Sequence, residues 1–476
     1  MSTAAPAGAL DDRRGYPQRV YRTSVLPLRD AQIRFAGTAQ TSVQAMVEEE
    51  RDAERLSMAR DALRQSHLVA FPTETVYGLA GNALDEQAVR KIFAAKGRPA
   101  DNPLIVHISD RGMLTQLVPA AYALSPAYMA LTDAFWPGAL TLLVPADGER
   151  VPAVVRCGLA TLGVRMPSHA VARALIALAQ RPLAAPSANV SGRPSPTTAQ
   201  HVCQDMTWRE GGAVLGRIPY SLDGGPCDVG VESTVVDGIT APDELRILRP
   251  GGVSVEQIRA TLAARGIADG VRVRVYGKDM ATGGAAEAHP STPGMKYRHY
   301  SPDAEVVLLR TRRGASEKDE QQAARRAPRS SPTALDVSAV VAQEVTACRR
   351  ARGRDVRVGV MSMDDSPLTA RLLGAAPRAC PSGLRTPVQH DGYTVHGFSL
   401  GRRGWPDEAA RRLFDGLRTL DEGVHAPEAV QDDDEAVAHG KCDVIFVEAP
   451  SEDAGVALAI LNRIQKAASR TFVVTA

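Results

Sequence analysis

The sequence has few aromatic residues, no paired cysteines and no long apolar run. Phe, Trp and Tyr make up 4% of the 476 residues, so the core must be mainly aliphatic. The six cysteines lie far apart with no C-x-x-C pair, which argues against a zinc ribbon and against a disulfide framework. This cysteine usage fits a reducing, intracellular compartment. No stretch approaches the roughly 18 consecutive apolar residues of a transmembrane helix, so we expect no membrane association.

The sequence also lacks a strong charge bias. Its 56 basic and 54 acidic residues leave a net charge of +2, which gives no electrostatic case for a nucleic-acid coat or a membrane-surface protein. The N-terminal stretch contains arginines but no apolar segment of the kind found in secretory signals. We therefore expect a cytoplasmic protein. Two aspartates in this stretch argue against a mitochondrial transit peptide, but a mitochondrial pool stays open.

Apolar runs typical of strands alternate with helical periodicity along most of the chain. Residues 169–180 and the segment from Asp85 to Lys96 show helical spacing, with Asp85 as a helix cap. This alternation predicts an α/β protein with a mixed sheet. The predicted strands are LIVHI (104–108), LTLLVPA (140–146), TLGVRMP (161–167), PLAAPSA (182–188), STVVDG (233–238) and LRILRPG (245–251).

The length predicts two or three domains. We expect residues 1–50 to be an N-terminal extension with one strand, and residues 51–275 to form the first domain. Small residues, Gly and Pro mark 276–302 as a linker. A second α/β unit follows over 303–476. Within it, the Arg-rich tract near 311–354 has little periodicity and is predicted to be a disordered insertion, and QDDDEA is predicted to be an acidic loop.

The segment KGRPADNPLIVH, residues 96–107, carries two cations next to an apolar run. Pro99 biases Arg98 toward extended backbone, and in an extended segment Lys96 and Arg98 point to the same side. Such a pair can clamp a polyanion, with lysine as a point charge and arginine as a planar fork. A solvated pair before a buried strand is the competing interpretation.

Four further polar segments accompany the ends of predicted strands: PTETVYGLAG (72–81), GVRMPSH (163–169), PSANVSGRPSPT (186–197) and VESTVVDG (231–238). Ligands settle at strand ends in open α/β sheets. Ser195-Pro196 resembles a helix cap followed by proline at the first helical position, and a helix N-terminus attracts anions. Capped turns, a surface loop and a surface arginine are the alternatives. The sequence has neither a P-loop nor a strand-linked G-x-G-x-x-G, so a nucleotide site must be built from scattered Lys, Arg, Ser and Asn.

Taken in order, these segments resemble the YrdC family, in its long two-domain form. The resemblance is close over about residues 55–302 and looser over 303–476. It implies a twisted mixed-sheet YrdC-like catalytic domain followed by a smaller Rossmann-like α/β domain. The matching segments are PTETVYGLAG, KGRPADNPLIVHI, WPGALTLLV, VRMPSH, PSANVSGRPSPT, VESTVVDG, ILRPGG, PGMKYRHYSP, CDVIFVEAP and GVALAILNRI.

The resemblance also implies an activity. Members of this form are nucleotidyltransferases that make threonylcarbamoyl-AMP and pyrophosphate from L-threonine, bicarbonate or CO2, and ATP. The product serves a downstream threonylcarbamoyl transferase complex that modifies tRNA. We expect Mg²⁺, held mainly by the ATP phosphates, because the sequence has no dedicated metal-ligand cluster. A weak contact with tRNA stays open. The alternatives are a non-catalytic RNA-binding module and a carbamoyl-adenylate enzyme of hydrogenase maturation, whose paired cysteines are missing here.

The resemblance assigns roles to matching positions. Lys96 and Arg98 are the implied catalytic residues, and PGMKYRHYSP is the implied lid. The implied ATP-binding residues are Lys96, Arg98, Asn102, Ser187, Asn189, Ser195, Arg249, Tyr297, Arg298, His299 and Tyr300. The implied threonine-binding residues are Thr75, His107, Thr161, Arg165, Ser233 and Thr234.

Overall fold

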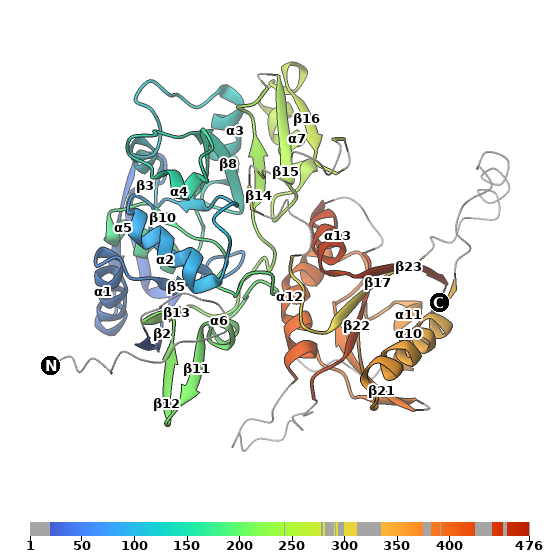
Figure 1. Ribbon diagram of the computed structural model, residues 1–476. Coiled ribbons are helices and arrows are strands. Elements are labelled where there is room, and N and C mark those ends of the chain that lie inside the picture. Colours follow the sequence, from blue (N-terminus) through green and yellow to red (C-terminus); the bar gives the residue numbers. More distant parts are fainter. Residues whose placement is uncertain are drawn as a thin grey trace.

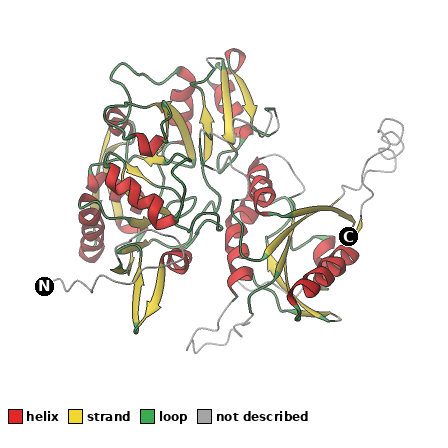
Figure 2. Cartoon of the chain, viewed as in Figure 1, coloured by secondary structure: helices red, strands yellow, loops and turns green. Residues whose placement is uncertain are grey.

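The protein forms two α/β domains that lie side by side (Figure 1). Helices cover the sheets of both domains (Figure 2). Among the described residues, no helix is long and apolar enough to cross a membrane. The computed structural model describes residues 20–241, 243–277, 279–280, 290, 292–293, 299–311, 335–374, 382–390, 392–423, 440–450 and 455–475.

The first domain is built on a large mixed sheet, as the alternating pattern predicted. Parallel pairs such as β7 with β9 alternate with antiparallel pairs such as β8 with β9. All six predicted strands are present. In spatial order the strands are β16 (Arg272–Val275), β15 (Glu244–Arg249), β14 (Thr234–Asp237), β8 (Leu140–Pro145), β9 (Thr161–Arg165), β7 (Ile105–His107), β10 (Leu183–Ala184), β6 (Gly78–Asn82), β5 (Val69–Phe71), β13 (Tyr220–Asp223) and β2 (Ser24–Pro27).

Helices and short strands complete this domain around an aliphatic core. The smaller sheets are β1 (Tyr21–Arg22) with β12 (Ala213–Gly216) and β11 (Thr207–Glu210), and the hairpin β3 (Ile33–Thr38) with β4 (Ser42–Val47). The helices are α1 (Glu50–Arg64), α2 (Glu86–Lys96), α3 (Pro126–Phe135), α4 (Ala153–Arg156), α5 (Ala170–Ala179), α6 (Ala199–Met206) and α7 (Val255–Ala264), with 3-10 turns η1 (Asp30–Gln32), η2 (Arg111–Gln116) and η3 (Ala268–Gly270).

The prediction of an N-terminal extension is wrong for residues 20–49. In this stretch β2 joins the main sheet by pairing in parallel with β13, and β1 pairs with β12. Leu26, Leu28 and Ile33 are buried in the domain core. Periodicity gave little signal here because the strands are short, and because β1 and β2 depend on partners almost 200 residues away. Residues 1–19 lie outside the described residues.

Local signals place α2, the helix that leads into the cationic segment. Asp85 is its N-cap and accepts a hydrogen bond from the Gln87 backbone N–H, as predicted. Gly97 ends the helix at φ 60°, a left-handed conformation that costs glycine little. Lys96 is therefore the last helical residue, and the prediction that it lies in extended backbone beside Arg98 is wrong. The proline restriction acts on Arg98, and it does not reach back past Gly97.

The second domain is a nearly all-parallel sheet with helices on its faces, which confirms the predicted Rossmann-like class. In spatial order its strands are β18 (Leu335–Asp336), β23 (Arg470–Thr475), β17 (Glu305–Thr311), β22 (Val444–Glu448), β19 (Arg357–Ser362), β21 (Tyr393–Ser399) and the antiparallel edge β20 (Val388–His390). Its helices are α10 (Val337–Arg352), α11 (Pro367–Leu373), α12 (Pro406–Glu422) and α13 (Gly455–Ala467).

The predicted disordered insertion is wrong for residues 335–354, which form β18 and α10. Val337, Val340, Val341 and Val345 are buried at helical spacing against the sheet. The many arginines of this tract concealed that spacing, because three of them occupy the exposed last turn of the helix. Residues 312–334 and the predicted acidic loop lie outside the described residues.

Two helices of the second domain, α12 and α13, face the first domain (Figure 1). Each inserts one fully buried arginine. Arg418 of α12 donates to the Pro194 carbonyl and to Asp205, and Arg463 of α13 donates to Glu232. Because a buried guanidinium must be paired, these contacts define how the domains dock.

Candidate active site

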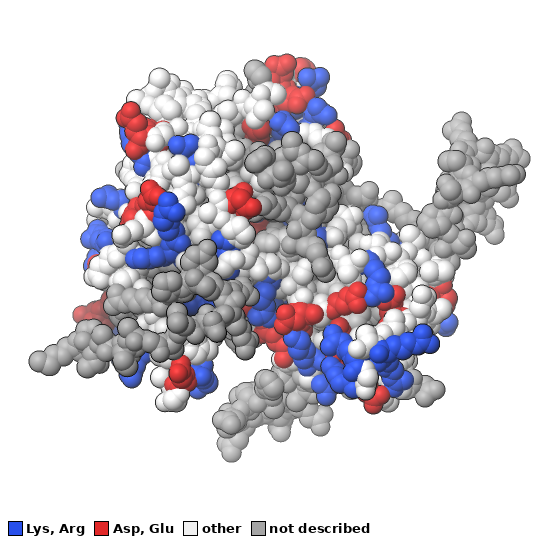
Figure 3. All heavy atoms as spheres, viewed as in Figure 1, with Lys and Arg blue, Asp and Glu red and all other residues white. Residues whose placement is uncertain are grey.

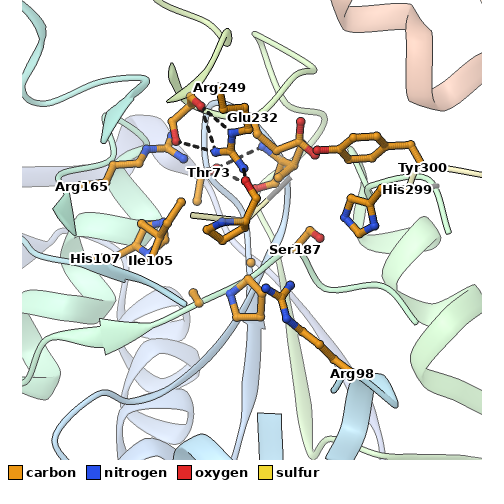
Figure 4. A pocket seen from close by; sticks show the side chains of 16 residues that line it. Thr73, Arg98, Ile105, His107, Arg165, Ser187, Glu232, Arg249, His299 and Tyr300 are labelled. Atoms are coloured by element: carbon orange, nitrogen blue, oxygen red, sulfur yellow. Dashed lines mark hydrogen bonds between the residues drawn. The ribbon is translucent and has the colours of Figure 1, made fainter. Parts of the chain in front are cut away.

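A cavity that opens to solvent lies where several strands of the first domain end and the linker returns. Arg165 and Arg249 are the last residues of β9 and β15, and His107 is the last residue of β7. Figure 4 shows their side chains around this cavity with Arg98 on its opposite side. The lining residues are Thr73, Val76, Gly78, Arg98, Ile105, His107, Arg165, Ala185, Pro186, Ser187, Glu232, Ser233, Arg249, Pro293, His299 and Tyr300.

Arg98 presents a buried cation to this cavity. Its Nη2 donates to the carbonyls of Asn102 at 3.0 Å and Pro103 at 3.2 Å. Its Nε is buried and has no hydrogen-bond partner among the residues that the structure describes. Burial lowers the pKa of Arg98 to about 10, which still leaves the guanidinium charged at neutral pH. The Asn102 side chain does not line the cavity, although its Oδ1 is also buried without a partner.

Lys96 lies behind the cavity wall. Its Nζ donates to the backbone carbonyls of Ser187 and Asn189, the latter at 2.6 Å, and to the Asn189 Oδ1 at 3.4 Å. Burial, with Arg98 nearby, lowers the pKa of Lys96 well below its usual value. The lysine thus ties the end of α2 to the loop that carries Ser187, which itself lines the cavity.

Asn189 and Ser195 shape the same loop. The Asn189 amide donates to the carbonyls of Val190 at 2.8 Å and Arg193 at 2.9 Å. The prediction that Ser195 caps a helix is wrong, because α6 begins at Ala199 and its cap is Thr198. Pro196 keeps Ser195 out of helical backbone. Ser195 instead donates to Glu232 at 2.6 Å, so no helix N-terminus meets an anion at this position.

Arg165 is held by three groups of the first domain. Its Nη1 donates to Thr75 Oγ1 at 2.8 Å, its Nε to the Gly138 carbonyl at 3.3 Å, and its Nη2 to Glu74. Thr161 begins the same strand, about 13 Å away at the usual rise per residue, and does not line the cavity. The structure therefore brings Thr75 to Arg165 but not Thr161.

Ser233 and Thr234 point in different directions because they are neighbours in extended backbone. The Ser233 Oγ lines the cavity, lies 2.7 Å from Thr141 Oγ1 and accepts from Arg249 Nη2 at 3.1 Å. Thr234 is fully buried and donates to the Val253 carbonyl. Thr234 therefore supports the fold behind the cavity.

The linker contributes His299 and Tyr300 to the cavity wall. Their ring centroids lie 4.3 Å apart. Burial raises the pKa of Tyr300 to about 12, with the Glu232 carboxylate acting in the same direction, so the phenol stays protonated. Tyr297 and Arg298 lie outside the described residues.

Sequence reasoning missed Glu232, the acidic residue of the cavity lining. It accepts from Ser195 of the first domain and from Arg463 of the second. Burial alone would raise its pKa, but Arg463, Arg249 and Ser195 together lower it to about 2. Its position in VESTVV was the available signal, since a carboxylate beside two hydroxyls at a strand start is uncommon in a core.

Both histidines of the cavity are expected to be neutral across the physiological range. Burial lowers the pKa of His107 to about 3, helped by Arg165, and burial and Arg98 lower the pKa of His299 to about 3. The unfolded chain takes up these protons as the pH falls through 6.5, and the folded protein does not. These two residues therefore reduce stability progressively as the pH falls below 6.5.

Proton NMR tests this prediction. The ring signals, assigned by comparison with His107→Gln and His299→Gln, should not shift between pH 5.5 and 8, a range of about two units that spans an ordinary histidine pKa. A titration step in either signal inside that range would contradict the burial argument.

Comparison with known proteins identifies relatives of both domains. The family model described as Telomere recombination matches residues 61–251, and the one described as Threonylcarbamoyl-AMP synthase, C-terminal domain, matches residues 253–469. The threonylcarbamoyl-AMP synthase of Bacillus subtilis is 36% identical over 414 residues, which span 87% of this chain and 93% of that protein. That of Pyrococcus abyssi is 48% identical over 257 residues, 54% of this chain and 68% of that protein.

Solved structures agree with these relatives. The structure of P. abyssi Sua5 complexed with L-threonine has 34% sequence identity and a TM-score of 0.62, and it covers 95% of this chain and 100% of that one. The two family models match in sequence order, and the B. subtilis relative matches over nearly its full length. The chain therefore belongs to the threonylcarbamoyl-AMP synthase family, in its long two-domain YrdC form.

Proposed function

We propose that this protein forms threonylcarbamoyl-AMP and pyrophosphate from L-threonine, bicarbonate or CO2, and ATP. The observation that carries the proposal is the charge of the cavity wall, where three arginines and one glutamate line a single hollow. Its two neutral histidines add no charge. Such a wall suits two anionic substrates. The names of the related proteins, threonylcarbamoyl-AMP synthases, indicate which reaction this is.

The chemistry needs charge neutralisation and alignment more than a nucleophilic side chain. The threonine amine adds to CO2, forming a C–N bond and releasing a proton to give an N-carboxylate. That carboxylate attacks the α-phosphorus of ATP, a new P–O bond forms, and the bond to the leaving pyrophosphate breaks. Arg98, with Lys96 bracing the adjacent loop, would hold the phosphates as their charge shifts toward the leaving group.

Arg165 would bind the threonine carboxylate. Three of its five N–H groups are used in the bonds to Thr75, Gly138 and Glu74, which leaves two for a ligand at the cavity. Those three bonds fix the plane of the guanidinium, so a bidentate contact to a carboxylate costs little ordering. Ser233, held by Arg249, and His107, whose buried Nδ1 has no hydrogen-bond partner within the described part of the chain, would complete the amino-acid pocket.

The ATP side of the site would include Arg98, Ser187, Arg249, His299 and Tyr300. Ser195 would act through Glu232, and Asn102 and Asn189 through backbone geometry. The predicted contributions of Tyr297 and Arg298 fall on residues outside those described. The predicted lid over the site remains a proposal, supported by the three linker residues that already line the cavity, Pro293, His299 and Tyr300.

Mg²⁺ would enter with ATP. Within the described part of the chain, no group of three His, Cys, Asp or Glu side chains could hold a metal ion. Glu232 is already bound to Ser195 and Arg463, so it is a poor ligand. When bound to the phosphates, the ion supplies charge neutralisation.

The product would pass to a downstream threonylcarbamoyl transferase complex that modifies tRNA. We propose that the protein is located in the cytoplasm, and the question of an additional mitochondrial pool stays open.

Figure 3 shows basic and acidic side chains interspersed on the visible face, with Lys and Arg gathered on the second domain. A non-catalytic RNA-binding module would need a broad basic surface and exposed aromatic rings. Because basic and acidic side chains are mixed on the visible face, we expect direct contact with tRNA to be weak. A gel shift with tRNA in the absence of ATP separates the two functions.

A pyrophosphate-release assay tests the proposed activity. Release should require threonine, bicarbonate and ATP together, because the N-carboxylate forms only from the first two. Omitting any one of them should reduce release to background. Unchanged release without threonine would contradict the proposal, since it would show a nucleotide hydrolysis that does not use the amino acid.

A further inference from the structure

Arg463, on α13 of the second domain, reaches the wall of the active-site cavity from outside the catalytic domain. Its side chain is fully buried. Its Nε donates to Glu232 Oε2 at 2.9 Å, and its Nη1 donates to the Pro250 carbonyl in the turn after β15. The Arg463 Cζ also lies 5.9 Å from the ring centroid of Tyr300. One side chain thus contacts two loops and the linker.

Glu232 connects this arginine to residues that face the ligand. Its other carboxylate oxygen, Oε1, accepts from Ser195 at 2.6 Å, and the carboxylate faces Tyr300, whose pKa it helps to raise. Glu232 and Tyr300 both line the cavity (Figure 4). The two oxygens therefore join the second domain, the Ser195 loop and the linker at one point.

We propose that Arg463 is a positioning residue for the reaction: through its ion pair with Glu232 it holds the Ser195 hydroxyl and the Tyr300 ring in place at the cavity wall. The proposal rests on the proposed function and extends it, because it makes the second domain part of the active site. Arg463 acts through Glu232 and Tyr300 and is not itself a residue of the cavity lining.

The charges around Glu232 predict how its protonation changes when Arg463 is removed. The groups that face the carboxylate are Arg463 from α13, Arg249 from β15, Ser195 from its loop, and His299 and Tyr300 from the linker. Burial favours the protonated acid, and Arg463 opposes it most strongly. Without Arg463, the pKa of Glu232 rises from about 2, and the carboxyl is protonated as the pH falls. Once Glu232 is protonated, its two carboxyl oxygens no longer accept hydrogen bonds equally, because one of them carries the proton.

Three variants test the inference. Arg463→Met removes the charge at similar volume, and Arg463→Lys keeps a charge that can reach Glu232. Arg385→Met is the matched control, because Arg385 is equally buried in the second domain, pairs with Asp364 there, and is not in the cavity lining. The measurements are kcat and KM for pyrophosphate release, the calorimetric affinity for MgATP without threonine, and the melting temperature.

We expect Arg463→Met to lower kcat by about 10- to 100-fold, the range for misplacement of catalytic contacts by a remote change. Its MgATP affinity should fall as well. Arg463→Lys should recover most of kcat. Arg385→Met should lose as much melting temperature as Arg463→Met, with kcat unchanged. Equal kcat losses in Arg385→Met and Arg463→Met would overturn the inference, because they would reflect domain stability alone.

The pH profile gives a second readout that a purely structural role would not produce. Arg463→Met should lose kcat as the pH falls from about 7 to 5, since a buried carboxyl can shift upward by several units. The double variant Glu232→Gln/Arg463→Met has no titrating carboxyl and should lack this acid limb. An acid limb that persists in the double variant would overturn the assignment to Glu232.

The assays also separate this inference from the proposed function. If the unmodified protein releases no pyrophosphate with all three substrates, the proposed function fails. MgATP binding, measured without threonine, still reports on Arg463 in that case. Unchanged MgATP affinity in Arg463→Met, together with unchanged kcat, would sink the inference while leaving the proposed function intact.

Discussion

Arg98→Ala is expected to reduce pyrophosphate release by about 100-fold or more, the scale for loss of one preorganised donor to developing charge. Arg98 lines the cavity, and its buried Nε has no hydrogen-bond partner among the residues described in the structure. Its Nη2 bonds to the carbonyls of Asn102 and Pro103 hold the guanidinium in position. The loss should appear mainly in kcat, because the charge on the phosphates shifts during the reaction.

The helix that precedes Arg98 in the sequence, α2, offers a control. Arg90 of α2 is an exposed arginine paired with Glu86 one turn away, and its side chain is 66% exposed. Arg90→Ala should retain activity within a factor of about two, since an exposed pair contributes little. Near-normal release by Arg98→Ala would contradict the assignment of the cavity as the nucleotide site. Arg98→Lys should fall between the two, because it keeps the charge but loses the fork.

Asp205→Ala is expected to lower the free energy of unfolding by about 3–5 kcal/mol, as for removal of one partner from a buried ion pair. The Asp205 carboxylate accepts from Arg193 Nη1 and from Arg418 Nη2, both at 2.7 Å. The Asp205 side chain is fully buried, and that of Arg418 is 1% exposed. Without the carboxylate, Arg418 keeps only the longer 3.4 Å contact of its Nη1 with Glu422, so its buried Nη2 loses its charged partner between the two domains.

Urea unfolding measures this loss, and two comparisons interpret it. Asp61→Ala removes an exposed carboxylate paired with Arg60 and should leave the unfolding midpoint unchanged. Asp205→Ala/Arg418→Met removes the stranded charge as well and should recover part of the stability, because apolar groups can replace a buried pair. If Asp205→Ala unfolds at the same urea concentration as the unmodified protein, the docking role of this cluster is wrong.

The fold could be predicted where structure depends on neighbours in sequence. Apolar runs marked the six predicted strands of the first domain, and Asp85 with Gly97 set the ends of α2. The same approach failed for residues 20–49, where β1 and β2 are short and need partners far along the chain. It failed again for α10, where charged residues on the solvent face concealed a valine stripe.

The candidate site could be predicted in part. Of the fifteen predicted residues that the structure describes, eight line one cavity. The other seven do not: Thr75, Lys96, Asn102, Thr161, Asn189, Ser195 and Thr234. The prediction of a helix cap at Ser195 is wrong for a local reason, because the N-cap of α6 is Thr198. Those that line the cavity are Arg98, His107, Arg165, Ser187, Ser233, Arg249, His299 and Tyr300.

The sequence by itself determined which chemical groups stand at the ends of strands, because strand period, helix caps and proline restrictions act over four residues or fewer. Only the tertiary structure decided how those groups are held. Glu232 meets Arg463 across 231 positions, and Asp205 meets Arg418 across 213. Nothing adjacent to either residue encodes such a pair, since a buried charge takes its partner from whichever chain segment folding brings beside it.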